Sequence, residues 1–186
     1  MQTYWFDKNQ KYTGEQLAPL YNYLKHGVLG DSIVGWQGPC DVTLEHMMDG
    51  EDLRVKSKIA GEKMLHFVLE LFHFPLSSAV ALQRLMGEIL ILKIKQHAKT
   101  AHPLKRSGDD LYWDKKKLNI SIATCSQTSS LIHFGVNISN EGTPVETCAL
   151  EDFGIDDVVA FAASYMDACK DEVFSLRRAV VKVRTF

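Results

Sequence analysis

"WDKKKLNISIATCSQTSSLIHFGVNIS", residues 113–139, is the stretch of this sequence that predicts the fold. Apolar and polar side chains alternate in both of its halves, as they do in strands whose successive side chains point to opposite faces. The five residues "CSQTS" between the halves suit the loop of a hairpin. The apolar positions are Leu118, Ile120 and Ile122 in the first half and Ile132, Phe134, Val136 and Ile138 in the second.

If the two strands pair, these apolar stripes are expected to merge into one core face. The opposite face then carries Lys117, Asn119, Ser121, His133 and Asn137. An antiparallel sheet often packs one face on the core and leaves the other available. We therefore expect this polar face to be solvated or to carry a ligand.

The remaining segments predict helices beside this β-rich block. Runs of strands beside runs of helices indicate an α+β fold with helices on one side of the sheet. We expect one domain over residues 1–186, with a central mixed, mostly antiparallel sheet. The predicted elements are a strand at 2–7, a helix at 15–26 that stops at Gly27, a strand at 31–37 broken by Gly38-Pro39, a helix at 60–72, a helix from Pro75 to about 97, the β-rich block 109–147 and a helical block from about 156.

Length and composition are those of a single globular domain. The chain has 186 residues, a formal net charge of -2, 46% hydrophobic and 24% charged residues. This charge gives no general attraction to nucleic acid or membrane, so we expect neither as a partner. The longest apolar stretch, 77–96, is interrupted by charged residues and predicts a buried helix rather than a membrane span.

The cysteines and the first residues predict a cytoplasmic protein with reduced thiols. Four cysteines are far apart and form no CxxC pair, and "MQTYWFDKNQ" lacks the features of a signal peptide. The histidines show no HExxH spacing, and neither GxGxxG nor GxxxxGK occurs. We therefore expect no metal and no cofactor.

Two residues are candidates for chemistry, and each has an ordinary structural alternative. Lys117 at the end of a strand could neutralise an anion or move a proton, or it could be a solvated surface lysine. Cys148 could be a nucleophile if a cation lowered its pKa, or a small buried hydrophobic residue. The basic segment 93–117 could dock an acidic partner or a phosphate, or it could be a solvated connector.

The sequence resembles known proteins at two levels, at "GDDLYWDKKKLNISIATCSQTSSLIHFGVNIS" and "GDSIVGWQGPCDV". Over nearly its whole length it resembles the prokaryotic family called domain of unknown function 366. The β-rich block also resembles the core of the biotin and lipoate protein ligases and the octanoyl (lipoyl) transferases. In "DKKKLNIS", Lys117 matches the lysine that contacts the acyl group or the acyl-adenylate in that superfamily, and "GVNIS" is similar to the segment ending the next strand.

Two further segments carry the resemblance to the transferases. "TCALEDFGI" is similar to their cysteine segment, with Cys148 at the nucleophile position, although Thr147 replaces a proline and Ala149 a glycine. "WQGPCD" is similar to a transferase loop, which implies that Trp36 and Gly38 close the site. The "RRxxGGG" and "GRGRxG" segments of the ligases have no counterpart.

The resemblance implies an acyltransferase in which Cys148 and Lys117 move an acyl group from a thioester to an amine. The substrate-binding residues would be Trp36, Gly38, Asn119, Ser121, His133 and Asn137, and the partner an acyl thioester or an acyl carrier protein. Two alternatives remain open: a non-catalytic member of the fold that binds a small molecule or a partner, and an ATP-dependent acyl ligase.

Overall fold

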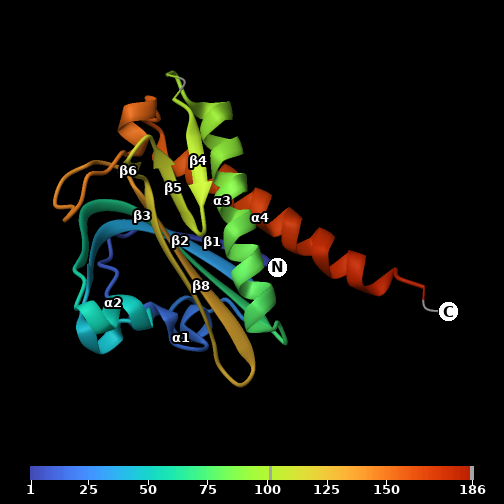
Figure 1. Cartoon of the computed structure of the whole chain (residues 1–186). Helices are drawn as coiled ribbons and strands as arrows, with labels where there is room; N and C mark the ends of the chain where they lie inside the picture. The colour runs from blue at the N-terminus through green and yellow to red at the C-terminus, as the bar shows by residue number, and fades with distance from the viewer. Residues whose placement is uncertain (101, 185–186) are drawn as a thin grey trace.

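A five-stranded sheet is the centre of the fold, and a three-stranded sheet lies beside it (Figure 1). The structure is a computed structural model that describes residues 1–100 and 102–184. The large sheet has the strand order β1-β2-β3-β8-β7, and the small sheet has the order β4-β5-β6. β1 is parallel to β2, and the other strand pairs are antiparallel. The predicted α+β fold with a mostly antiparallel sheet is confirmed.

The strands and helices have the following bounds. The strands are β1 Gln2–Phe6, β2 Ser32–Val42, β3 Ile59–Phe72, β4 Leu104–Ser107, β5 Asp110–Trp113, β6 Lys116–Lys117, β7 Asn119–Cys125 and β8 Ser129–Asn137. The α-helices are α1 Tyr21–His26, α2 Gly50–Val55, α3 Leu76–His97 and α4 Val158–Val181, with short 3₁₀ helices at Glu15–Leu17, Leu44–His46 and Leu150–Phe153.

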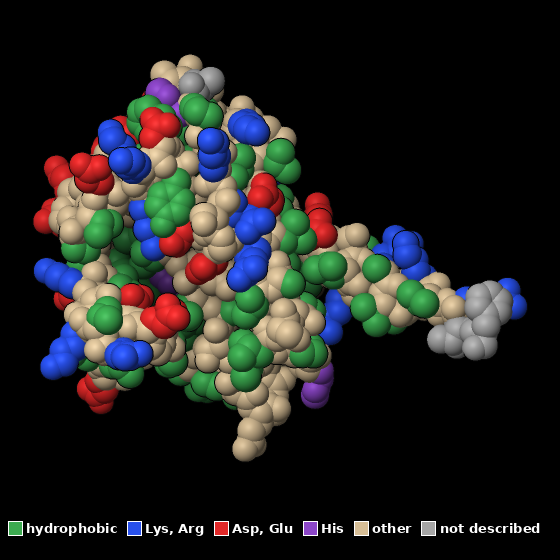
Figure 2. All heavy atoms as spheres, viewed as in Figure 1, with side chains coloured by type: hydrophobic (Ala, Val, Ile, Leu, Met, Phe, Trp, Pro, Cys, Tyr) green, Lys and Arg blue, Asp and Glu red, His purple; other side chains and the backbone are tan. Residues whose placement is uncertain are grey.

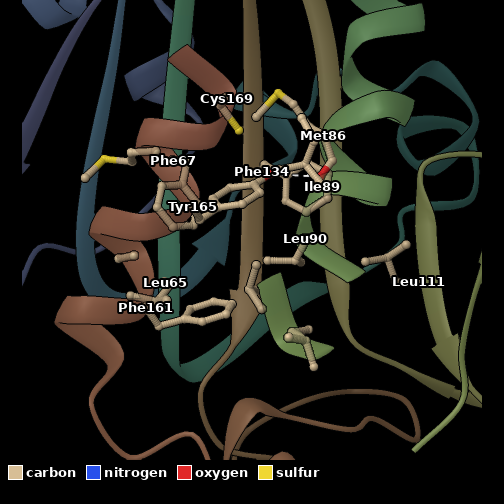
Figure 3. Packing of buried hydrophobic residues seen from close by; sticks show 14 of the residues in the cluster. Leu65, Phe67, Met86, Ile89, Leu90, Leu111, Phe134, Phe161, Tyr165 and Cys169 are labelled. Atoms are coloured by element: carbon tan, nitrogen blue, oxygen red, sulfur yellow. Dashed lines mark hydrogen bonds between the residues drawn. The ribbon is translucent and has the colours of Figure 1, made fainter. Parts of the chain in front are cut away.

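The two long helices cover one face of the large sheet. Phe67 of β3 and Phe134 of β8 point into this layer, toward Tyr165 of α4 and Met86 of α3 (Figure 3). The Tyr165 hydroxyl donates to the Met86 carbonyl at 3.2 Å, so the polar atom of this buried ring is paired. All four residues are fully buried, and a core of this kind supplies most of the stability of a domain of this size.

The opposite face of the sheet carries a second, smaller core. It is formed by residues of the first 42 positions, among them Tyr12, Leu17 and Trp36, together with Val68 and Leu131 from the sheet. The sheet is thus covered on both faces.

The predicted single polar face is therefore wrong. Asn119 and Ser121 lie on the helix side of the sheet, whereas His133 and Asn137 lie on the side of the second core. They come near one another only at the edge of the sheet, where the segment around α2 leaves a cavity.

The predicted hairpin forms, but its two strands pair one residue away from the predicted register. β7 and β8 are antiparallel, with Ser121 opposite Phe134 and Ile122 opposite His133. Ile120 and Ile122 therefore face the second core instead of the helices. The cause lies at Leu118, where the chain passes from the small sheet to the large one, so that strand alternation is interrupted. A one-residue shift exchanges the two faces of a strand.

One predicted helix and one predicted strand break are wrong. The predicted helix 60–72 is β3, the middle strand of the large sheet. It is buried on both faces from Met64 to Leu71, and such a continuous apolar run fits a helix and a central strand equally well. The predicted break at Gly38-Pro39 is a bulge inside β2, which continues to Val42.

The two long predicted helices, α3 and α4, are present in the structure. α3 begins after Pro75 and ends at His97, and α4 begins after Asp157, whose side chain accepts from the Ala160 N–H. The predicted helix 15–26 is instead a 3₁₀ turn followed by α1, although Gly27 does end it in the left-handed conformation. Among the described residues, none of the helices is long and apolar enough to span a membrane.

Candidate functional site

A cavity of about 360 Å³ opens at the edge strand β7, between the small sheet and the segment around α2. We call it the hairpin cleft. Figure 2 shows this face hollowed, with acidic and basic side chains around the opening. Four of the predicted site residues line it: Lys117, Asn119, Ser121 and Asn137. Four carboxylates also line it: Asp49, Asp52, Asp109 and Asp110.

Two lysines line the hairpin cleft, Lys58 and Lys117, and the Lys117 ammonium group is held in place by an ion pair. Its Nζ lies 2.9 Å from Oδ1 of Asp110, and both side chains are mostly buried, at 30% and 24% exposure. Such a pair fixes the position of the amine more than it stabilises the fold. An acyl or carboxyl oxygen in the cleft could accept from Lys117 without displacing Asp110, because an ammonium group has three N–H donors.

Asn119 and Ser121 shape the wall of the cleft through bonds within the protein. Asn119 accepts from the Leu111 N–H and donates to the Asp109 carbonyl, which joins β7 to β5. The Ser121 hydroxyl accepts from the Gln83 amide of α3 and donates to the His133 carbonyl. Both side chains are therefore held in place by partners within the protein, and they fix the wall of the cleft.

Asn137 and Cys148 lie next to the Lys117 backbone. The Asn137 amide donates to the carbonyls of Lys117 and Cys148, and its own oxygen has no partner among the described residues. The Cys148 thiol is fully buried in the core on the helix side, where its Sγ contacts the Lys116 carbonyl at 3.5 Å. Burial raises the pKa of this thiol to about 11.

The predicted Cys148–Lys117 pair is not formed in this structure. The thiol and the ammonium group have different partners, and Cys148 does not line the hairpin cleft. A nucleophilic cysteine needs access to its substrate and a thiolate near neutral pH. Burial and a raised pKa remove both conditions and argue against this residue as the nucleophile.

Trp36 and Gly38 lie inside strand β2 and not in a loop over the cleft. The Trp36 indole is buried in the second core and donates to the Gln10 carbonyl at 2.9 Å. Gly38 is packed against the same backbone, because a Cβ added to it would lie 1.9 Å from the Gln10 oxygen. The room that Gly38 provides is therefore filled by the protein itself, and neither residue lines the hairpin cleft.

His133 lines a side pocket of about 60 Å³ that adjoins the hairpin cleft, with Ile120 and Ser121 lining both. Its ring stacks on Tyr12 at a centroid separation of 3.6 Å, and its Nε2 lies 3.1 Å from Nδ1 of His66. The sequence predicted His133 in the site but gave no sign of Tyr12 or His66. His66 lies on β3, which the sequence predicted as a helix, and Tyr12 is placed beside β2 by a bridge to Cys40.

The described residues contain no group of three or more His, Cys, Asp or Glu side chains that could hold a metal ion. The four carboxylates of the cleft are spread around its rim, where Asp110 is paired with Lys117 and Asp109 accepts from Gln83. The cleft offers a ligand the Lys117 cation, the Asn137 amide oxygen, which has no partner among the described residues, and an adjoining side pocket lined by Tyr12 and His133.

The fold is similar to that of the biotin and lipoate protein ligases. The chain is similar in structure to the biotin protein ligase from Aquifex aeolicus in complex with biotin and ATP, with a TM-score of 0.61, 13% identity, and coverage of 90% of this chain and 68% of that one. It is also similar to a bi-partite lipoate protein ligase from Thermoplasma acidophilum, with a TM-score of 0.62, 8% identity, and coverage of 94% and 83%. At these identities the likeness shows the fold alone.

The chain belongs to the family described as domain of unknown function DUF366, whose model matches residues 1–184. It is 36% identical over 153 residues to an uncharacterized protein from Methanocaldococcus jannaschii, covering 79% of this chain and 68% of that protein. A protein of unknown function from Pyrococcus horikoshi has the same fold, with a TM-score of 0.88, 34% identity and coverage of 99% of both chains.

Proposed function

We propose that the hairpin cleft binds the acyl group of a small carboxylic acid and that the protein transfers this group to an amine. The observation that carries the proposal is Lys117, held by Asp110 at one end of a cavity in a ligase-like fold. The proposal is also supported by the sequence motif "DKKKLNIS", in which Lys117 resembles the lysine that contacts the acyl group in the ligases and transferases. The partner would be an acyl thioester or an acyl carrier protein.

The buried thiol favours direct transfer over an acyl-enzyme on Cys148. In direct transfer, the nitrogen of the acceptor amine attacks the thioester carbonyl carbon, the C–S bond breaks, and the leaving thiolate takes the proton that the amine loses. Lys117 would donate a hydrogen bond to the carbonyl oxygen as negative charge develops on it. The protein then acts by holding and polarising the acyl group.

A thioester assay with two lysine variants tests this proposal. Octanoyl-coenzyme A and a lysine-containing peptide are the probes, and mass spectrometry follows octanoylation of the peptide. Lys117→Ala is expected to lower transfer at least roughly 10-fold, since a hydrogen bond from a charged group contributes about 1.5–3 kcal/mol. Lys115→Ala, two residues away and exposed, is the control and should transfer normally.

Cys148→Ala separates the two mechanisms. Direct transfer predicts that this variant keeps its activity and that the wild-type protein gains no octanoyl mass. A stable octanoyl adduct on Cys148 would overturn direct transfer. Binding of the probe without any transfer, unchanged by Lys117→Ala, would show instead a non-catalytic binding protein.

A further inference from the structure

We propose that the side pocket next to the hairpin cleft recognises an amide-type group at the far end of the acyl chain, with His133 as hydrogen-bond acceptor and Tyr12 as donor. This inference rests on the proposed function, because it assigns a substrate class to the same cleft. It is carried by a chain of hydrogen bonds that leaves one nitrogen of a buried histidine unused.

The hydrogen-bond chain starts at the Gly38 carbonyl, which can only accept. His66 Nε2, at 3.2 Å, must therefore carry the proton and donate to it. In a neutral His66 ring the other nitrogen, Nδ1, then accepts, so that Nε2 of His133 is the donor at 3.1 Å. The Nδ1 of His133 is left as an unprotonated acceptor.

Burial keeps both rings neutral. His66 is 0% and His133 2% exposed, and desolvation lowers the pKa of both, to about 4 for His66. Near neutral pH both rings are therefore neutral and carry their proton on Nε2. His66 acts on a ligand only through His133, so His66 is a positioning residue.

The side pocket has the size and polarity for a small head group. Its volume of about 60 Å³ exceeds the roughly 10–15 Å³ that one water needs, so a small polar group fits. Ile120 and Ile122 give it apolar walls, and Asp49, Asp52 and His46 also line it. The Nδ1 of His133 and the hydroxyl of Tyr12 have no hydrogen-bond partner among the described residues, and both side chains line this pocket.

The two ends of the site are separated by the length of an acyl chain. His133 and Asn137 lie on the same face of β8, four residues apart, which corresponds to about 13 Å along a strand. Asn137 marks the end with Lys117, because its amide donates to the Lys117 carbonyl. A chain that reaches from Lys117 to the side pocket would bring an N–H group to His133 and a carbonyl to Tyr12.

Three acids of matched length test the inference by isothermal titration calorimetry. The monoamide of octanedioic acid ends in an N–H donor, its monomethyl ester ends in acceptors only, and octanoic acid ends in a methyl group. The monoamide is expected to bind roughly 10-fold more tightly than octanoic acid, because an apolar end leaves buried polar atoms unpaired. The ester keeps a carbonyl for Tyr12 but offers no N–H to His133, so its affinity should lie between those of the other two acids.

His133→Phe keeps an aromatic ring against Tyr12 but removes the acceptor, so it should abolish the preference for the monoamide. His26→Phe is the control, since His26 lies among Tyr4, Phe6 and Tyr21 and does not line the cleft. Nitrogen NMR of the wild-type protein gives a readout that needs no variant. It should show His133 protonated at Nε2 and unprotonated at Nδ1.

The outcomes separate the two proposals. Equal binding of the three acids, or a His133 protonated at Nδ1, would overturn this inference and leave the proposed function standing. Failure of all three acids to bind would overturn the proposed function, and the substrate class with it. A preference for the monoamide that survives in His133→Phe would also overturn the role of His133.

Discussion

His66 is the residue that ties the second core to the side pocket, and its charge state should set part of the pH dependence of stability. Its ring is fully buried between Trp36 and Tyr12, and it donates to the Gly38 carbonyl of β2. Desolvation lowers its pKa from 6.5 to about 4 in the folded protein. The unfolded chain therefore takes up a proton at a higher pH than the folded one.

The direction in which stability changes with pH follows from this difference in proton binding. A group that is neutral when folded and has a higher pKa when unfolded stabilises the fold fully above about pH 6.5. This stability is lost as the pH falls from about 6.5 toward 4. Between pH 7 and pH 5 the free energy of unfolding is expected to fall by about 2 kcal/mol through His66 alone.

Urea denaturation at both pH values measures this effect in the wild type and in His66→Gln. Glutamine cannot titrate, so the variant should lose about 2 kcal/mol less between the two pH values. Carboxylates titrate in both proteins and cancel in the comparison. The same loss in both proteins would contradict the assignment of the effect to His66.

At the scale of elements, two neighbouring acidic residues at the start of α4 allow a helix cap and a surface ion pair to be compared. The Asp157 side chain accepts from the Ala160 N–H at 3.0 Å and so caps a helix of 24 residues. Its neighbour Asp156 forms an ion pair with Lys99 on the surface, where both side chains are mostly exposed. A helix cap contributes about 1 kcal/mol, whereas an exposed ion pair contributes little.

Asp157→Ala is therefore expected to lower the free energy of unfolding by about 1 kcal/mol, and Asp156→Ala by much less. Thermal denaturation followed by circular dichroism compares the two variants. A larger loss in Asp156→Ala would show that the ion pair with Lys99, and not the cap, holds the start of α4.

The sequence predicted those elements whose ends carry strong local signals. Pro75 and Asp157 mark the beginnings of α3 and α4, and the alternation over residues 118–138 marks a hairpin. β3 was missed because a strand buried on both faces has no period of two. Its apolar residues then matched a helix by coincidence.

Of the candidate site, only the residues on or next to the two hairpin strands could be predicted from the sequence. Lys117, Asn119, Ser121 and Asn137 meet in one cleft because neighbouring strands carry them. Trp36 was misplaced because the bulge at Gly38 looks like a break when the neighbouring strand is not known. The burial of Cys148 depends on packing beneath the helices, which no local pattern in its segment encodes.

At the scale of the whole molecule, the reactivity of the cysteines shows when each of the two cores unfolds. Cys125 is exposed at the tip of the hairpin, and the other three are buried. Cys40 lies in the second core, whereas Cys148 and Cys169 lie in the core beneath the helices. Their exposure therefore shows whether the two cores unfold together.

We expect one thiol to react with Ellman's reagent in the native protein and the other three to become reactive in a single transition in urea. Cys125→Ser should remove the fast reaction and leave the transition unchanged. Exposure of Cys40 at a lower urea concentration than Cys148 and Cys169 would contradict the prediction of one domain over residues 1–186. That result would mean that the second core unfolds on its own.

The position of β3 has a consequence for how the chain folds. Its partner β8 follows only after α3 and the small sheet, so Phe67 must meet Phe134 across a long stretch of chain. Pairing between distant segments is slow, because the entropy of closing the loop is lost before the contacts form. During synthesis, β3 leaves the ribosome before β8, so the backbone edge that β8 will pair and the apolar side chains of β3 stay uncovered. We therefore expect β3 to be prone to aggregation in the nascent chain.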